Sequence, residues 1–398
     1  MEFMILTEEE FRNFSDTHPL KNFIQTPEMA HIRKQLGYEC WYIGVKEKEE
    51  IKAATMIGAK TTRFGKKEFY APRGLLINYE DSKLLQFFTD SIKKFVKEND
   101  GYVFRIDPYY LTKERDIDGK EVSNGFNHSL GIENLKKLGY RKCKNVYQIF
   151  TYMFSKDLNT SKEEIYKSFH SLPKRMIKKA EESKIIIREA TFEELEKVQK
   201  LIDETGERKN FHSRNLDYYQ LLYQNFYPRN EVKFMLGEID VNLYKSIKKD
   251  KIQVLEKELE NMKTDKKKEE CNNKIEKEKK DLEEVSKLDV DSNGKFLLSA
   301  GVFLLYGEEL VYLFGGNKKQ FMHYGSSYKM QWEMMQYGLE HGFKKYNFYG
   351  IPGMPSKEDG VYNFKRGFDG YIEELIGDYE YPVSFYYYIH KLIHIIKR

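Results

Sequence analysis

The segment Gly360–Gly370 reads GVYNFKRGFDG and places two adjacent cations, Lys365 and Arg366, among aromatic residues and glycines. Aromatic neighbours reduce the hydration of an amine, and glycines allow other groups to approach the backbone closely. A cation in such surroundings can stabilise a developing oxyanion or a leaving alkoxide. The alternative interpretation is that Lys365 ends a short helix beside a C-cap glycine.

A carboxylate of interest occurs in GYVFRIDPYY, where Asp107 lies at the exit of an apolar strand that Pro108 halts. Ligand sites in open α/β sheets lie at the carboxyl ends of strands. Asp107 can there accept a proton or orient an amine. It can equally be an ordinary turn aspartate before a proline.

A basic cluster in LPKRMIKKAEESK comprises Lys174, Arg175, Lys178 and Lys179, within two turns of a predicted helix. Cations near a helix start can hold a phosphate or a pyrophosphate. The alternative is a solvated basic face. HIRKQLGYE offers Arg33 in a similar role.

Several common chemistries have no sequence signature in this chain. We find no Walker loop, dinucleotide glycine fingerprint, HExxH or Gly-x-Ser-x-Gly motif. The nine histidines are dispersed, and the three cysteines have neither metal-binding spacing nor an even count. We therefore expect no metal and no cofactor, and an enzyme of this kind would receive a substrate that is already activated.

Length and charge place broad limits on the protein. The 398 residues suffice for two or three domains, and the net charge of +4 does not by itself indicate nucleic-acid binding. The acidic start MEFMILTEEEF does not resemble a signal peptide, and no apolar run reaches the roughly 20 residues of a membrane span. These features, with the unpaired cysteines, predict a cytoplasmic protein.

Alternating strands and helices are predicted on both sides of a charged central segment. The first part contains predicted strands at Cys40–Lys46, Lys52–Ala59 and Lys67–Gly74, a helix over Lys83–Lys97 capped by Asp81, and a strand in VYQIFTYMF. The last part contains a helix in SSYKMQWEMMQYGLEHG, then strands in KKYNFYG and YIEELIGDY. A shared Lys-x-Gly-aromatic pattern, at Lys137–Tyr140 and Lys365–Phe368, indicates two related α/β halves, each a mixed sheet with helices against it.

The central segment, from Leu243 to Leu288, lacks Gly, Pro and Arg. Its apolar residues follow heptad spacing in two runs, Ile252, Leu255, Leu259 and Met262, then Cys271, Ile275, Leu282 and Val285, with KTDKKKEE between them. The pattern predicts two antiparallel helices that form a coiled-coil arm roughly 30 Å long. The arm is either a partner-binding element or a simple structural hairpin.

The tail SFYYYIHKLIHIIKR, from Ser384 to Arg398, interleaves aromatic and aliphatic residues with cations, among them Lys391, Lys397 and Arg398. Such a segment either touches a membrane surface or packs on its own domain.

Six blocks together resemble the Fem family of peptidoglycan aminoacyltransferases: FYAPRG, RIDPYY, LPKRMIKKAEES, FGGNKKQFMHYGSSYKMQWEMMQYG, KYNFYGIPG and GVYNFKRGFDG. The resemblance spans nearly the whole chain. It implies an α/β (α+β) fold of two acyl-CoA N-acyltransferase-like domains with an inserted antiparallel helical coiled-coil arm. The expected boundaries are residues 1–150 for the first domain, 151–242 with 291–398 for the second, and 243–290 for the arm.

Fem proteins take an amino acid from an aminoacyl-tRNA and attach it to an amine of the peptidoglycan precursor stem peptide. The resemblance therefore implies transfer of Gly, Ala or Ser to a UDP-linked or lipid-linked muramyl-pentapeptide, or to the growing bridge. It also implies that lysines of the arm contact tRNA phosphates. The tRNA ester would supply the activation that no nucleotide motif provides. Two alternatives are an acyl-CoA-dependent N-acyltransferase, whose Arg/Gln-x-x-Gly-x-Gly/Ala turn is not visible, and a non-catalytic tRNA-binding protein.

The resemblance also implies how the precursor is bound. Arg33 and Arg175 would hold its pyrophosphate, with Lys174 nearby. The family position matched by Arg33 is often lysine, and the planar guanidinium could alter precursor preference.

Four further residues would line the reacting ends of the substrates. Tyr102 and Asp107 would contact the peptide or sugar, and Lys365 with Phe364 would lie at the reaction centre. Lys365 would stabilise charge as an amine attacks the aminoacyl ester, with no covalent enzyme intermediate. The proximity of two bound substrates would provide much of the rate.

Overall fold

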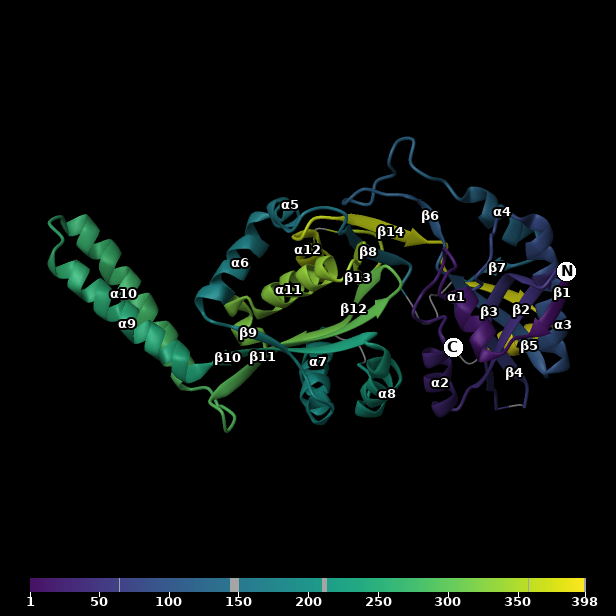
Figure 1. Cartoon of the computed structure of the whole chain (residues 1–398), viewed down its shortest axis with the longest axis horizontal. Helices are drawn as coiled ribbons and strands as arrows, with labels where there is room; N and C mark the ends of the chain where they lie inside the picture. Colours follow the sequence, from purple (N-terminus) through teal and green to yellow (C-terminus); the bar gives the residue numbers. More distant parts are fainter. Residues whose placement is uncertain (64, 144–149, 210–212, 357, 397–398) are drawn as a thin grey trace.

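A computed structural model describes residues 1–63, 65–143, 150–209, 213–356 and 358–396. Figure 1 shows an elongated body with two sheets side by side and a helical hairpin that projects from one end. Part of the strand predicted in VYQIFTYMF, residues 146–149, lies outside the described residues, as do Lys397 and Arg398 of the tail.

The first sheet is mixed. Its described strands are, in spatial order, β1 (Glu2–Ile5), β2 (Glu39–Glu47), β3 (Glu50–Thr61), β4 (Lys67–Arg73), β5 (Gly101–Pro108), β15 (Tyr379–Pro382) and β7 (Arg141–Lys142). Among these, β4 and β5 run parallel, and α3 (Ser82–Glu98) crosses between them. The helix begins as predicted, because the side chain of Asp81 accepts a hydrogen bond from the Leu84 amide at 3.0 Å.

The second sheet repeats this plan. Its described strands are, in spatial order, β6 (Leu111–Glu114), β14 (Tyr371–Leu375), β8 (Tyr152–Asp157), β13 (Lys345–Ile351), β12 (Glu309–Asn317), β11 (Lys295–Tyr306), β10 (Val232–Asp240) and β9 (Ile186–Glu189). Here β12 and β13 run parallel, and α11 (Ser326–Glu340) crosses between them. A parallel pair bridged by one long helix in each sheet agrees with the two related halves predicted from the sequence.

Helices cover both faces of each sheet. Beside α3 and α11 the described helices are α1 (Glu8–Ser15), α2 (Pro27–Gln35), α4 (Ser129–Lys137), α5 (Lys162–Ser168), α6 (Ser171–Glu182), α7 (Leu195–Lys209), α8 (Leu216–Phe226), α12 (Gly360–Arg366) and α13 (Tyr386–Ile396). The segment around Lys365 is therefore helical, as the alternative interpretation of GVYNFKRGFDG proposed. Helix α11 packs closely on α6, since a Cβ at Gly325 would lie 2.2 Å from the Met176 carbonyl oxygen.

The two domains exchange strands, and the expected boundaries need correction. Strand β6 lies before residue 150 but joins the second sheet, where it pairs with β14. Strand β15 lies near the C-terminus but joins the first sheet between β5 and β7. The predicted strand YIEELIGDY is divided at Gly377, whose φ of +80° turns the chain from one sheet to the other.

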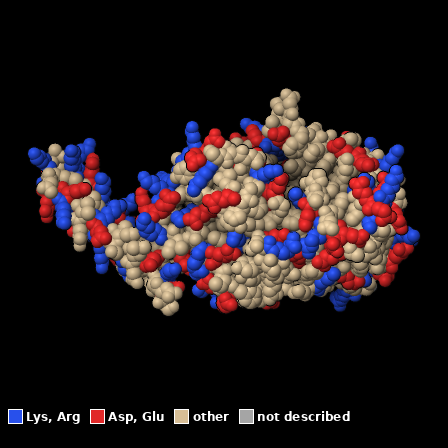
Figure 2. Space-filling model, viewed as in Figure 1, with Lys and Arg blue, Asp and Glu red and all other residues tan. Residues whose placement is uncertain are grey.

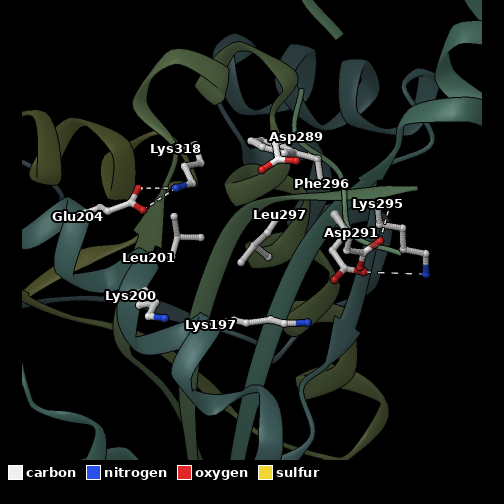
Figure 3. A pocket seen from close by; sticks show the side chains of 11 residues that line it. Lys197, Lys200, Leu201, Glu204, Asp289, Asp291, Lys295, Phe296, Leu297 and Lys318 are labelled. Atoms are coloured by element: carbon white, nitrogen blue, oxygen red, sulfur yellow. Dashed lines mark hydrogen bonds and ion pairs between the residues drawn. The ribbon is translucent and has the colours of Figure 1, made fainter. Parts of the chain in front are cut away.

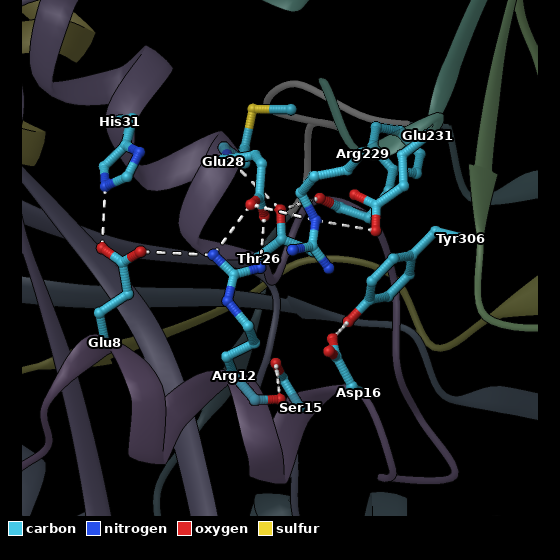
Figure 4. A network of polar contacts seen from close by, with 12 residues as sticks. Glu8, Arg12, Ser15, Asp16, Thr26, Glu28, His31, Arg229, Glu231 and Tyr306 are labelled. Atoms are coloured by element: carbon cyan, nitrogen blue, oxygen red, sulfur yellow. Dashed lines mark hydrogen bonds and ion pairs between the residues drawn. The ribbon is translucent and has the colours of Figure 1, made fainter. Parts of the chain in front are cut away.

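The domains also share one hydrophobic core. Helices α1 and α2 of the first domain and α7 and α8 of the second enclose a continuous cluster that includes Phe11, Ile32, Leu201 and Tyr219, all buried. A polar network lies beside it (Figure 4), in which Glu28 pairs with Arg12 of its own domain and with Arg229 of the other. These contacts fix the orientation of the two sheets and hence the groups between them.

Two antiparallel helices, α9 (Val241–Glu260) and α10 (Asp265–Ser286), form the projecting hairpin. The predicted apolar positions meet in its interior, where Ile252, Cys271 and Ile275 are buried. The link between the helices is shorter than predicted, because α10 already begins at Asp265, within the KTDKKKEE segment. At the base, Lys248 bonds Glu278 at 2.5 Å and Asp281 at 2.7 Å, which ties the two helices together.

Within the described part of the chain, no helix combines the length and the apolar character needed to cross a membrane.

Candidate functional site

The centre of the site is a bulge in β13. The register between β13 and β8 shifts from Asn347↔Ser155 to Gly350↔Met153, so two residues of β13 oppose one residue of β8. Tyr349 lies in this bulge with φ of +66°, an uncommon conformation for a residue with a side chain. Bulges of this kind redirect backbone groups out of the ladder and are frequent beside active sites.

The redirected carbonyls receive the Lys365 ammonium. The Nζ of Lys365 donates to the carbonyl oxygen of Gly350 at 2.5 Å and to that of Tyr349 at 3.1 Å. Lys365 is 5% exposed, and burial lowers its pKa from the ordinary 10.5 to about 7; Asp359 partly opposes this, and Lys209 adds to it. Near neutral pH the group can therefore be present both as a cation and as a free amine.

A buried acid lies at the end of β5, as predicted. Asp107 is 2% exposed and accepts a hydrogen bond from the Arg73 backbone amide at 2.7 Å. The guanidinium of Arg73 is also buried, 3.6 Å from the carboxylate. Burial raises the pKa of Asp107 to about 6 although Arg73 favours the charged form. An acid and a base that titrate around neutrality are thus available at one junction between the sheets.

Tyr349 connects the two centres. Its backbone accepts from Lys365, and its buried ring lies within the electrostatic influence of Arg73 and Asp107. Burial raises the pKa of the Tyr349 phenol to about 12, so the group stays protonated and can donate. The second domain thereby places the lysine and the first domain the acid, with Tyr349 between them.

Arg33 extends this row of groups along the first domain. Its guanidinium lies 4.4 Å from the ring centre of Tyr38 and 5.7 Å from that of Tyr70, and Tyr70 in turn lies beside Asp107. Among the described residues, four buried polar atoms in this row have no hydrogen-bond partner at normal distance: Nε and Nη2 of Arg33, the Tyr70 hydroxyl and Oδ2 of Asp107, which lies 3.6 Å from Arg73. Buried polar atoms are nearly always satisfied, so such a row fits a polar ligand.

The other predicted cations lie elsewhere. Lys174 donates to the Lys167 carbonyl oxygen at 2.6 Å on α6, and the exposed Arg175 lies beside the Tyr328 ring. Figure 1 draws α2, which carries Arg33, and α6 in separate parts of the molecule. The two arginines therefore do not converge on one pyrophosphate, and that part of the expected arrangement is corrected.

Phe364 joins the Arg175 side of the site. Its ring centre lies 4.9 Å from that of Tyr328, the same ring that Arg175 approaches. Phe364 directly precedes the buried Lys365 in α12, so its ring lies one helical position from that amine.

Tyr102 is not brought to Asp107. Both residues belong to β5, but they lie at opposite ends of the strand, and an odd separation along a strand points two side chains to opposite faces. The Tyr102 hydroxyl donates to Glu68 at 3.2 Å, and its ring packs edge-on against Tyr386 of α13. The position predicted for Tyr102 beside the acid is therefore corrected.

The sequence reasoning missed Arg73, Tyr349 and Tyr70. Arg73 stood in the quoted block FYAPRG and Tyr349 in KYNFYG, but neither block reveals a left-handed residue at the end of a buried strand. Arg73 has φ of +56°, and its Nη2 donates to the Phe150 carbonyl oxygen at 3.0 Å. These constraints arise from contacts that are distant in sequence.

A separate hollow of about 290 Å³ lies beside the base of the hairpin (Figure 3). Its lysines face carboxylates, with Lys318 on Glu204 at 2.5 Å and Lys295 at 4.0 Å from Glu238. Neither Lys365 nor Asp107 lines this hollow, so it is distinct from the junction described above.

The repeated mixed sheets give the chain a tandem acyltransferase-like fold. The chain is similar to a tandem GNAT protein from the clavulanic acid biosynthesis pathway, with a TM-score of 0.53, 8% identity, and coverage of 96% of this chain and 98% of the other. It is also similar to the crystal structure of FemX, with a TM-score of 0.77, 22% identity, and coverage of 99% and 100%. Both likenesses concern the fold.

The sequence comparisons identify the family. A model described as the FemAB family matches residues 6–397, and the chain belongs to that family. Aminoacyltransferase FemA of Staphylococcus aureus, in strains that include NCTC 8325 and MRSA252, is 30% identical over 406 residues, which cover 96% of each chain. The resemblance seen in the sequence is thereby confirmed, as is the predicted α/β fold of two acyltransferase-like domains, and the chain is an aminoacyltransferase.

Proposed function

We propose that this protein transfers an amino acid from an aminoacyl-tRNA to an amine of a peptidoglycan precursor stem peptide or of its growing bridge. The observation that supports this most directly is Lys365, a buried amine with pKa near 7 held on two carbonyl oxygens. Relatives at 30% identity carry the name aminoacyltransferase FemA.

The chemistry is acyl transfer from an ester to an amine. The acceptor nitrogen attacks the ester carbonyl carbon, a C–N bond forms, the C–O bond to the tRNA ribose breaks, and the ribose oxygen leaves with a proton. The protonated form of Lys365 stabilises the negative charge that develops on the oxygens. The carboxylate of Asp107 receives one proton from the acceptor ammonium, which frees the amine for attack, and the second proton that the nitrogen loses passes to the departing ribose oxygen. Arg73 and Tyr349 keep these two groups in position.

The row of unsatisfied polar atoms suits the acceptor. Arg33 offers two N–H groups that match the oxygens of a phosphate or a carboxylate, and Tyr70 and Asp107 offer hydrogen-bonding groups farther along. A muramyl-pentapeptide with a UDP-linked or lipid-linked pyrophosphate carries such groups along its length. We assign the pyrophosphate end to Arg33 and the amine end to Asp107, and leave Arg175 to the donor side with Phe364.

The hairpin suits the donor. Its exposed lysines alternate with acids, and Figure 2 shows both charges interspersed along it. Local lysine contacts rather than a uniform basic surface would then hold the tRNA. Lys267 and Lys268, exposed at the outer end of the hairpin, are the residues to test.

The test is a transfer assay with purified protein. It offers tRNA charged separately with Gly, Ala or Ser, and a lysine-containing muramyl-pentapeptide in both linked forms, with product mass as the readout. We expect a gain of one residue from one charged tRNA. If no combination reacts and acetyl-CoA instead donates an acetyl group, the acyl-CoA alternative replaces the proposal. If neither donor reacts but charged tRNA binds, the protein is the non-catalytic tRNA-binding alternative.

A matched pair of variants tests the role of the hairpin. K267A/K268A should raise the KM for charged tRNA and weaken its salt dependence while kcat stays near the wild-type value. K94A/K97A removes two exposed lysines from α3 and should change neither. Equal effects of the two pairs would exclude the hairpin as the tRNA contact while leaving the reaction itself intact.

A further inference from the structure

Helix α13 is attached to the first domain by its polar side. The Tyr387 hydroxyl donates to Glu380 on β15 at 2.6 Å, and Lys391 forms an ion pair with the same carboxylate. Tyr386 packs edge-on against Tyr102, with 5.2 Å between the ring centres, and His390 lies 5.1 Å from that ring. The attachment therefore combines these polar contacts with aromatic packing, in which Tyr387 is buried against Tyr102 and Val103.

The apolar side of α13 is exposed to solvent. Phe385, which directly precedes the helix, is 76% exposed, and Leu392, Tyr388 and Ile389 on the helix are 59%, 42% and 41% exposed. Their spacing of three, four and seven residues puts them in one stripe. Isolated exposed apolar residues are normal, but a contiguous stripe on one helix marks an interaction surface.

Cations border this stripe. On β7, at the edge of the sheet next to β15, Arg141 lies opposite Glu380 on the α13 side, and its guanidinium donates to the Tyr388 hydroxyl at 3.1 Å. The exposed Lys391 of α13 is the second cation. The nearby carboxylate of Glu380 is 2% exposed and already paired with Lys391. The surface around the stripe therefore presents positive charge beside exposed aromatic and aliphatic side chains.

We propose that α13 and β7 form a docking surface for an anionic lipid bilayer. An interfacial helix inserts Phe, Leu and Ile side chains at the boundary between headgroups and acyl chains, while flanking cations bind anionic headgroups. The stripe supplies Phe385, Ile389 and Leu392 for the first contact, and Arg141 of β7 with Lys391 of α13 supplies the second. A second copy of the chain is a less suitable partner for the stripe. In such a dimer the cations beside one stripe would lie close to the same cations of the other copy, and like charges repel.

This surface is separate from the reaction centre. It lies at the β5 end that carries Tyr102, and Asp107 lies at the other end of the same strand. The inference therefore goes beyond the proposed function and does not require it, since docking can be measured without any substrate.

The experiment is vesicle co-sedimentation of the full chain, with vesicles of phosphatidylcholine alone or mixed with phosphatidylglycerol. The wild type should bind the mixed vesicles and not the neutral ones. F385S/L392S should weaken that binding by about tenfold or more, because two apolar side chains no longer enter the interface. The matched control L243S/V254S removes two exposed apolar residues from the hairpin and should bind like the wild type.

A second variant separates the electrostatic contribution from folding. R141Q leaves α13 unchanged and should lower binding to the mixed vesicles roughly fivefold, with a weaker dependence on salt. The matched control K142Q removes the neighbouring cation, which faces the other side of the sheet, and should bind like the wild type. Thermal unfolding of each variant within a few degrees of the wild type shows that the fold is intact.

Three results would overturn the proposal. They are no binding of the wild type to mixed vesicles, equal binding of the wild type and F385S/L392S, and a concentration-dependent wild-type dimer that F385S/L392S abolishes without any vesicle binding. The last result would assign the stripe to a second copy of the chain.

Discussion

Replacing Lys365 with methionine should abolish transfer. Near neutral pH it should also remove the free energy that the folded protein loses by keeping a charged lysine buried. The amine is nearly fully buried and its pKa is lowered to about 7. A lysine with a lower pKa in the folded chain binds fewer protons there than in the unfolded chain. The wild type therefore becomes more stable as the pH rises from about 7 toward the ordinary lysine value of 10.5.

The magnitude follows from the pKa difference. Lowering a lysine pKa from 10.5 to about 7 costs the protonated folded state about 5 kcal/mol, at about 1.4 kcal/mol for each tenfold change in the ionisation constant. About 3 kcal/mol of this is recovered between pH 7 and pH 9.5. The methionine variant has no such group, so its stability relative to the wild type should decline by about 3 kcal/mol over the same interval.

The assay is urea unfolding of the wild type and K365M at both pH values, with the difference in free energy of unfolding as the readout. Taking the difference removes the titration of all other groups. Two carbonyl oxygens, of Tyr349 and Gly350, lose their donor in the variant, but this loss adds a nearly constant offset. The control is K178M, which removes an exposed lysine from α6 and should show no trend with pH.

A difference between K365M and the wild type that stays constant from pH 7 to pH 9.5 would refute the assignment of a lowered pKa to Lys365. In the transfer assay, K365M should reduce kcat by about a hundredfold or more, the effect typical of removing one oxyanion-stabilising donor. Retention of more than half the wild-type kcat would remove Lys365 from the reaction centre and leave the family assignment unaffected.

Three further predictions concern buried acids and the contact between the domains. D107N should lower kcat/KM by about a hundredfold. The wild-type rate, followed over pH 5–8, should rise through about pH 6 as Asp107 loses its proton and fall above about pH 7 as Lys365 loses its own; an unchanged acid limb in D107N would contradict this. Burial raises the pKa of Glu231 (Figure 4) to about 7, so the folded chain holds this proton more tightly than the unfolded chain. The wild-type free energy of unfolding, measured in urea, should therefore fall from pH 4.5 to pH 7. E231Q should make this decline smaller. E28A leaves Arg12 and Arg229 without their shared partner and should lower the free energy of unfolding by about 1–3 kcal/mol. The m value, the dependence of this free energy on urea concentration, should stay constant. A changed m value would indicate that the two domains now unfold separately.

Local patterns predicted much of the fold. The capping aspartate Asp81, the apolar run that becomes the buried strand β3 and the long helix α11 all have signals within a few residues of each other. Asp107 could be placed because a strand exit is a local feature and its location at the edge of a sheet is a general rule.

The remaining parts of the site depend on contacts across the chain. The conformation of Tyr349 follows from a register shift against β8, whose residues lie almost 200 positions earlier in the sequence. Arg73 is held by Asp107 and by the Phe150 carbonyl, neither of which a local pattern identifies. One error was avoidable, because the odd separation of Tyr102 and Asp107 already points their side chains to opposite faces of a strand.

The place of β15 between β5 and β7 has a consequence for biosynthesis. A ribosome releases β5 and the region of β7 more than 200 residues before it releases Tyr379–Pro382, so the first sheet keeps a gap until β15 has emerged. Until then the apolar strand β5 has an unpaired edge, which invites pairing with other nascent chains. We therefore expect β15 to govern the yield of folded protein in the cell, and premature termination just before β15 to prevent the first sheet from closing.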